Sequence, residues 1–143
     1  MWTTLTKNLR ATRRQVLLYV GLYLLCGLVM NALGKLLQIA AFASWWQVVS
    51  CYVLYLVPAS LLVRRYGPFQ QYLYGLFALA PLELAGYALG TSLAYPHNVL
   101  DRFFGERNFV LVMVVFFAWV LPCGNWAVAW LERRLFGSRA EAL

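Results

Sequence analysis

One acidic residue, Glu83, lies inside a long apolar stretch of this 143-residue chain, about midway between Tyr72 and Tyr95. If that stretch is a membrane-spanning helix with the tyrosines near its two ends, the carboxyl group lies close to the middle of the bilayer. A carboxyl group at that depth is costly unless it faces protein or water. Glu83 is therefore either part of a substrate or proton site or a hydrogen-bonding group between helices, and the sequence leaves both interpretations open.

The groups expected at the depth of Glu83 are polar but uncharged. No lysine or arginine falls at that level of the other apolar stretches, so the expected partner is a tyrosine hydroxyl. The candidates are Tyr23, Tyr52 and Tyr55. Gly86 and Gly90 follow Glu83 on the same helical face, three and seven residues later, and small residues in this pattern let a second helix approach closely.

Two arginine pairs, each at the end of an apolar stretch, form the second chemical signal. They are Arg64-Arg65 and Arg133-Arg134. Guanidinium groups bind phosphate in a bidentate manner and keep their charge, which suits the headgroup of a phosphorylated lipid. Asn125, about two helical turns before Arg133, is placed to join such a site or to bond a neighbouring helix. The alternative for the arginines is that they only orient the chain in the membrane.

The composition excludes most other chemistry. Hydrophobic residues make up 63% of the chain and charged residues only 12%, against about 25% in an average soluble domain. Three scattered cysteines and one histidine supply no metal-ligand pattern, and the sequence has no Ser-His-Asp set or glycine-rich phosphate loop. We therefore expect no enzyme, no cofactor and no metal. The net charge of +7 comes from basic residues beside apolar stretches, which indicates membrane topology rather than nucleic-acid binding.

Four apolar stretches are long enough to cross a bilayer, which takes about 20 helical residues. The flanking charges and aromatic residues predict helices over residues 15–34, 42–63, 69–95 and 109–131. Each stretch is apolar on all sides and too long for a strand, so the predicted fold class is all-α, in one polytopic membrane domain over residues 1–143. The remaining segments are a basic interfacial leader (1–14), an outer loop (96–108) in which Asn98 caps a short helix, and a cytoplasmic tail (132–143).

The distribution of basic residues predicts the orientation. With the N-terminus inside, nine of the 12 lysines and arginines lie on the inner side and only Lys35, Arg102 and Arg107 on the outer side. Because an excess of basic residues stays cytoplasmic, we expect both termini in the cytoplasm. A cleaved signal peptide over residues 1–43 is the weaker alternative, since its apolar core would be too long.

The chain also contains a weak internal repeat. The tripeptide Ala-Leu-Gly occurs at 32–34 and again at 88–90, and the second and fourth stretches both end in an arginine pair. These features indicate either one helical hairpin present twice in parallel or chance similarity between apolar sequences.

Over about residues 14–137 the chain resembles the GtrA-like four-helix proteins. The resemblance rests on the length, the four predicted spans, the repeated hairpin, and the two arginine pairs, which are followed by Tyr66 and Phe136. The resemblance implies two parallel helical hairpins in a bacterial inner membrane and a role in moving polyprenyl-phosphate-linked sugars. It also implies that the four paired arginines and Asn125 bind the lipid phosphate while Glu83 lines the path.

Three functions follow from these residues. The first is translocation of a polyprenyl-phosphate-linked sugar, or assistance to it, with membrane lipids and polyprenyl phosphate as ligands. The second is a proton-coupled exporter of small cations that uses Glu83, and the third is a structural or accessory subunit of a larger membrane complex. Because a bundle of 16.3 kDa is small to enclose a path for a large polar solute, we expect a homo-oligomer or a larger membrane partner.

Overall fold

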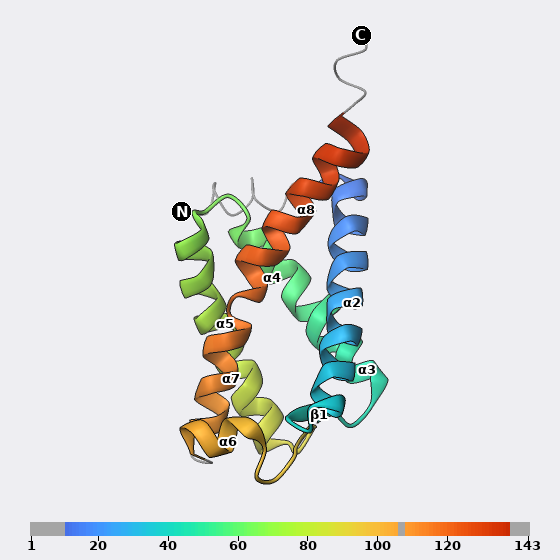
Figure 1. Cartoon of the computed structure of the whole chain (residues 1–143). Coiled ribbons are helices and arrows are strands. Elements are labelled where there is room, and N and C mark those ends of the chain that lie inside the picture. Colours follow the sequence, from blue (N-terminus) through green and yellow to red (C-terminus); the bar gives the residue numbers. More distant parts are fainter. Residues whose placement is uncertain (1–10, 106–107, 138–143) are drawn as a thin grey trace.

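The computed structural model describes residues 11–105 and 108–137, and within them the chain is helical apart from one short strand pair (Figure 1). The elements are α2 (Arg13–Leu36), β1 (Ala40–Phe42), a continuous helix composed of α3 (Trp45–Val48), the π-helix η1 (Val49–Leu56) and α4 (Val57–Val63), then α5 (Pro68–Ala88), β2 (Ser92–Ala94), α6 (Val99–Phe104), and α7 (Phe109–Phe117) followed by α8 (Val120–Phe136). The prediction of an all-α chain is confirmed, with five helices in the part of the chain described when α7 and α8 are counted as one helix, Phe109–Phe136.

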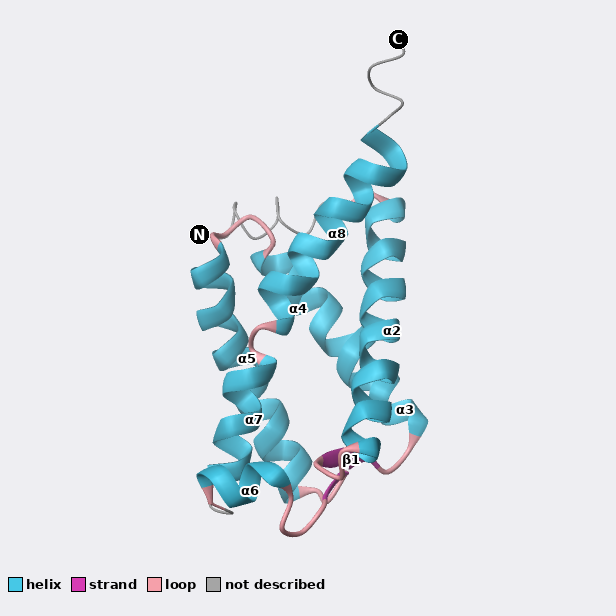
Figure 2. Ribbon diagram, in the orientation of Figure 1, coloured by secondary structure: helices cyan, strands magenta, loops and turns pink. Residues whose placement is uncertain are grey.

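The long helices run between two distinct ends of the molecule (Figure 1). At one end α2 begins, α4 ends, α5 begins and α8 ends; we call this the arginine end, after the two predicted pairs. At the other end lie α6 and the two strands, drawn in magenta in Figure 2, and we call it the strand end. The core runs along the contact of α2, η1, α4 and α8, and its most buried side chains include Tyr23, Val48, Ser60 and Leu121.

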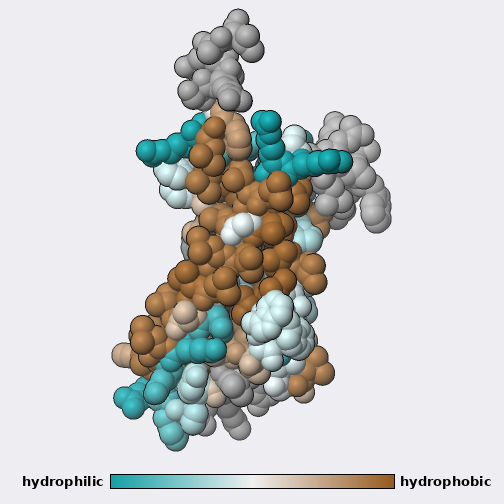
Figure 3. Space-filling view, turned by 90° about the vertical axis from the view of Figure 1, so that its right-hand side faces the viewer, coloured by the Kyte–Doolittle hydropathy of each residue, from teal (hydrophilic) through white to brown (hydrophobic). Residues whose placement is uncertain are grey.

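Three of the described helices are long and apolar enough to cross a membrane. They are Arg13–Leu36, Trp45–Val63 and Phe109–Phe136. The fourth long helix, α5, has 21 residues but carries Gln70, Gln71 and Glu83, and it is not among the three. A hydrophobic band covers the middle of the surface in Figure 3, with hydrophilic residues toward both ends, as expected for helices that face lipid.

Helix α2 starts and ends on recognisable local signals. Thr12 and Gln15 form a capping box, since Thr12 Oγ1 accepts from the Gln15 amide at 3.3 Å and Gln15 Oε1 accepts from the Thr12 amide at 3.1 Å. At the other end Gln38 has φ of +51°, and the Ile39 amide reaches back to the carbonyl of Gly34 at 2.9 Å. This bond pattern is a Schellman motif, which ends the helix and releases the chain into β1.

The third predicted helix, 69–95, was extended too far at its C-terminal end. It ends at Ala88 rather than at Tyr95, because Gly90 has φ of +61° and the Thr91 amide bonds the carbonyl of Gly86 at 3.0 Å, a second Schellman motif. Within this chain Gly90 does not pack against another helix, since a Cβ placed there would meet no atom within 4 Å, and packing against a partner stays a prediction. Its role is to take the left-handed conformation that glycine tolerates best.

The two halves of the chain correspond, but in a different register from the one that the sequence suggests. Gly90 repeats the place of Gln38, 52 residues earlier, and β2 follows it just as β1 follows Gln38. The two strands then pair antiparallel, with Ala41 opposite Leu93. The Ala-Leu-Gly tripeptides at 32–34 and 88–90 are therefore not equivalent, because Gly34 lies inside α2 and Gly90 lies beyond the end of α5.

Both of the helices that lead back to the arginine end are irregular just before a proline. The π-helix η1 precedes Pro58, which has no backbone N–H. The carbonyl four residues before Pro58 therefore has no α-helical donor. A bond from that carbonyl to the amide one residue after Pro58 is the bond of a π-helix, which explains why η1 lies here. Likewise, α7 stops at Phe117 and α8 resumes at Val120, just before Pro122. Helix α5 passes close to this break, because a Cβ on Gly75 would lie 2.7 Å from the carbonyl oxygen of Ala118.

The remaining boundaries agree with the sequence in part. Helix 2 begins at Trp45, since Phe42 belongs to β1, and α8 continues to Phe136, so residues 132–136 are helical rather than part of a tail. Asn98 caps α6 as predicted, with its Oδ1 accepting from the amides of Leu100 and Asp101 at 2.9 and 3.1 Å. Most of the predicted leader, residues 1–10, lies outside the described residues, and so do Arg107 and Arg139.

Candidate functional site

A chain of buried hydrogen bonds connects three helices near the arginine end. Tyr19 of α2 donates from its hydroxyl to Oδ1 of Asn125 on α8 at 2.7 Å, and Asn125 Nδ2 donates to Oε1 of Gln71 on α5 at 2.8 Å. Gln71 Nε2 donates in turn to the carbonyl oxygen of Tyr66 at 2.7 Å. The side chains of Tyr19, Asn125 and Gln71 are all more than nine-tenths buried, so their polar groups are satisfied inside the bundle.

A second set of polar contacts adjoins the first. Gln15 Nε2 donates to Oε1 of Glu132 on α8 at 2.8 Å, and Nη1 of Arg64 donates to Oε1 of Gln15 at 3.2 Å. Arg64 ends α4, so these contacts bring α4 to α2 and α8. We call the two sets together the polar network. Its members are Gln15, Tyr19, Arg64, Gln71, Asn125 and Glu132.

The residues predicted to hold a lipid phosphate lie at one end but have different neighbours. Arg64 is half-buried and bonded within the polar network, whereas Arg65 and Arg133 are exposed. The Arg134 guanidinium carbon lies 5.2 Å from the centre of the Trp130 ring, which is a cation–π contact. Asn125 follows the second of its two predicted alternatives, because its amide bonds neighbouring helices.

A cavity of about 1010 Å³ lies toward the strand end. Its walls come from the second half of α2, η1, the second half of α5, α7 and both strands, and most of the lining side chains are apolar. The polar side chains of the lining are Asn31, Cys51, Tyr52, Glu83, Thr91, Tyr95 and Asp101. No lysine or arginine of the described ranges lines it, so its two carboxyl groups, Glu83 and Asp101, make it an acidic, amphiphilic space.

Glu83 of α5 and Tyr52 of η1 both line this cavity. The Tyr52 side chain is only 5% exposed, and its ring packs against Gly27, where a Cβ would lie 2.6 Å from Tyr52 Cγ. No hydrogen bond joins Tyr52 to Glu83, and neither side chain has a hydrogen-bond partner among the described residues. Both polar groups are therefore available to a molecule that enters the cavity.

The other two tyrosines proposed as partners of Glu83 are engaged elsewhere. Tyr23 hydrogen-bonds the Ser60 hydroxyl and lies 3.2 Å from the carbonyl oxygen of Val120, in the core between α2, α4 and α8. Tyr55 donates to the carbonyl oxygen of Ala78 at 2.6 Å, one residue from the Phe77 carbonyl whose usual donor is absent at Pro81. None of the three candidate tyrosines hydrogen-bonds Glu83, and of the three only Tyr52 lines the cavity with it.

Asn31 supports the cavity wall at the strand end. Its Oδ1 accepts from the Phe42 amide at 2.9 Å, which ties β1 to α2 and holds the amide group beside the cavity. Gly86, the second residue predicted to mediate helix packing, lines the same space.

Several functional candidates were not evident in the sequence. Gln15, Gln71 and Glu132 are ordinary polar residues near helix ends, and only the packing of four helices makes them one network. The signal for Gln71 was present, because a glutamine one turn inside an apolar helix needs a partner. Asn31 and Asp101 meet Glu83 only because the strand pair and α6 close the cavity.

Residues 11–105 and 108–137 contain no group of three or more His, Cys, Asp or Glu side chains that could hold a metal ion. The three cysteines are free thiols. Comparison with protein-family models, curated proteins and solved structures finds no match to this chain, so the functional argument rests on its own residues.

Proposed function

We propose that the protein lies in the inner membrane of a bacterium and that α5 joins the three long apolar helices as a fourth membrane span. Both termini then lie in the cytoplasm. Helix α5 packs against α7 and α8 and runs along the bundle in Figure 1, which supports its place beside the other spans. Gln71 and Glu83 have a bonded network and a cavity to face, so their polarity is compatible with a helix inside a bundle. The two parallel hairpins are supported by the 52-residue correspondence of the helix ends and strands.

We propose further that the protein assists the passage of a polyprenyl-phosphate-linked sugar across this membrane. The observation that carries the proposal is the amphiphilic cavity of about 1010 Å³ near the strand end, with the two predicted arginine pairs, 64–65 and 133–134, at the opposite end. A lipid-linked sugar has matching parts: an apolar chain, a polar sugar and a phosphate.

The cavity lining suits the sugar part of such a molecule. Carboxylates and amide oxygens accept hydrogen bonds from sugar hydroxyls, and Glu83, Asp101 and Asn31 supply them. The aromatic rings of Tyr52 and Phe117 offer flat apolar surfaces, and the many leucines around them suit a hydrocarbon chain. The phosphate is bonded directly to the sugar and has no cationic partner in this lining, so we expect the arginine end to bind the phosphate before the sugar enters the cavity, not at the same time.

The test is a translocation assay with the full chain in proteoliposomes that contain a labelled polyprenyl-phosphate-linked sugar. The access of a membrane-impermeant oxidant to the sugar reports its side of the membrane. Tyr52→Phe removes one hydroxyl from the cavity, and we expect the rate to fall by about three- to tenfold, as for one hydrogen bond. Tyr74→Phe is the matched control, because Tyr74 is half-exposed and stacks on Tyr66 outside the cavity. Equal rates in empty vesicles and in vesicles with the protein would contradict the proposal.

A second candidate, proton-coupled export of small cations that uses Glu83, is favoured by one observation: the cavity has two carboxyl groups and no lysine or arginine among its described lining residues. Glu83→Gln separates the two functions. A neutral sugar can bond glutamine as well as glutamate, so its passage is expected to fall by tenfold or less, at roughly the strength of one hydrogen bond. A cation loses its charge partner, so its transport is expected to fall by about 100-fold or more.

A further inference from the structure

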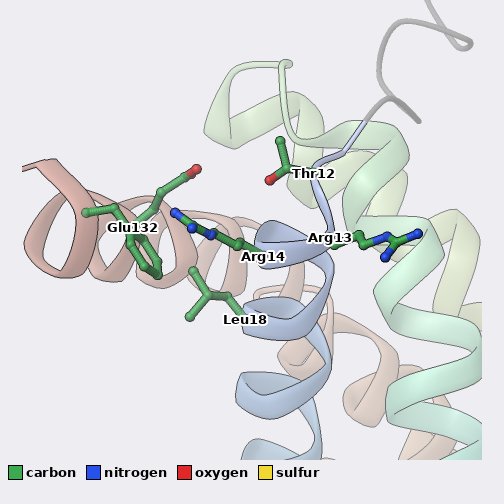
Figure 4. A pocket seen from close by; sticks show the side chains of 6 residues that line it. Thr12, Arg13, Arg14, Leu18 and Glu132 are labelled. Atoms are coloured by element: carbon green, nitrogen blue, oxygen red, sulfur yellow. The ribbon is translucent and has the colours of Figure 1, made fainter. Parts of the chain in front are cut away.

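A second hollow, smaller than the cavity, lies at the arginine end between the start of α2 and the end of α8 (Figure 4). Its volume is about 490 Å³, within the range of about 300–1,000 Å³ that is usual for ligand pockets. It is lined by Thr12, Arg13, Arg14, Leu18, Glu132 and Phe136. In Figure 4 the Arg14 side chain extends toward α8, whereas Arg13 points to the other side of α2.

The charges of this hollow are unequal. Arg13 and Arg14 form no ion pair with an acidic side chain in the described part of the chain. The one carboxylate present, Glu132, already accepts a hydrogen bond from Gln15 Nε2. Arg13 points away from the hollow, but Arg64, Arg65, Arg133 and Arg134 lie at the same end of the molecule as Arg14. Glu132 is the one acidic residue described at this end, so the local charge is positive and favours an anion.

Phe136 positions Arg14 without using its hydrogen-bond donors. The guanidinium carbon of Arg14 lies 5.5 Å from the centre of the Phe136 ring, a cation–π contact that acts through the charge of the group. Its N–H groups remain to be satisfied, and a planar guanidinium matches two phosphate oxygens. Leu18 and Phe136 add apolar surface to the same hollow.

We infer that this hollow binds the phosphate of a membrane lipid, with Arg14 as its cationic contact. The sequence pointed instead to the arginine pairs at 64–65 and 133–134. The inference deepens the proposed function and rests on it only for the identity of the lipid, because the charge and the apolar surface suit any lipid phosphate at this end. Leu18 and Phe136 in the lining give a lipid chain an apolar surface to lie against.

The test measures lipid retained by the full chain in native mass spectrometry, with phosphatidylglycerol and with diacylglycerol, which has no phosphate. We expect phosphatidylglycerol to be retained and diacylglycerol to be lost. Arg14→Gln is expected to weaken retention of phosphatidylglycerol by about tenfold or more, since one charge-assisted pair is removed. Arg14→Lys keeps the charge and is expected to retain an intermediate affinity, which also shows that the variant chains fold.

Two comparison variants make the result specific. Arg102→Gln, at the strand end, removes the same charge and is expected to change retention by less than threefold. Arg134→Gln is expected to lose less than Arg14→Gln, because its guanidinium lies outside the hollow, over Trp130. Equal losses for Arg14→Gln and Arg134→Gln, or equal retention of diacylglycerol, would overturn the inference.

Inorganic phosphate distinguishes the source of the ligand. If millimolar phosphate displaces phosphatidylglycerol, the phosphate group alone is recognised. If the lipid stays bound, its apolar part also contributes to binding. Both results support the hollow as a phosphate site. A failed sugar-translocation assay with normal phosphatidylglycerol binding would overturn the proposed function and leave this inference standing.

Discussion

Replacing Asn125 by alanine tests whether the polar network holds the helices together. The change removes the hydrogen bond from the Tyr19 hydroxyl and the hydrogen bond to Gln71 Oε1, which are 2.7 and 2.8 Å long and buried. Hydrogen bonds between helices in membranes contribute about 0.6 kcal/mol each on average, which gives a lower bound near 1.2 kcal/mol. The two groups left without partners raise the cost, so we expect the free energy of unfolding to fall by about 1.2–3 kcal/mol.

The assay is reversible unfolding of the full chain in mixed micelles, followed by far-UV circular dichroism across a denaturing-detergent series. A double-mutant cycle with Tyr19→Phe isolates the Tyr19–Asn125 contact, for which we expect a coupling energy of about 0.5–1.5 kcal/mol. The adjacent glutamines provide a matched control within one helix. Gln71 is buried and bonds Asn125, whereas Gln70 is exposed and accepts only from the Gly67 amide at 3.3 Å.

Gln71→Ala should therefore destabilise the protein by at least about 1 kcal/mol more than Gln70→Ala. If the two alanine variants unfold at the same detergent concentration, and Asn125→Ala unfolds with them, the network does not stabilise the bundle and the reasoning fails.

Three further predictions concern packing, topology and assembly. Gly27→Ala places a Cβ 2.6 Å from Tyr52 Cγ and should destabilise by about 1–3 kcal/mol in the same unfolding assay, whereas Gly21→Ala, with no atom within 4 Å of that Cβ, should not. In a chain with its three native cysteines replaced by alanine, Gly67→Cys and Phe103→Cys should react with an impermeant maleimide from opposite sides of the membrane; labelling from one side would show that α5 does not span it. Native mass spectrometry should give a mass above that of one 16.3-kDa chain, and a single-chain mass would exclude the expected oligomer or partner.

The positions of the helices were largely predictable, because lipid requires each long apolar stretch to satisfy its own backbone. The ends beside Arg14 and Val63 lie close to where charge and hydropathy placed them. The end of α5 was not found, because Gly90 looked like a packing glycine in an apolar stretch. Its left-handed backbone depends on the bond from Thr91 to Gly86, which is a local signal that hydropathy alone does not contain.

The site was less predictable than the fold, because its residues meet only through tertiary packing. Depth in the membrane identified Glu83 as unusual, and the structure places it at a cavity with Tyr52. Depth cannot say which face of a neighbouring helix turns inward, so Tyr23 and Tyr55 seemed equally good partners of Glu83. The same limit applies to Asn125, whose partners lie 106 and 54 residues away along the chain.

The pairing of β1 with β2 has a consequence for the order of biosynthesis. The two strands begin 52 residues apart, so β1 leaves the ribosome well before its partner exists. At about 5–20 residues per second, the delay is about 3–10 s. During that time one edge of β1 has no partner strand, while the Asn31 side chain can already satisfy the Phe42 amide.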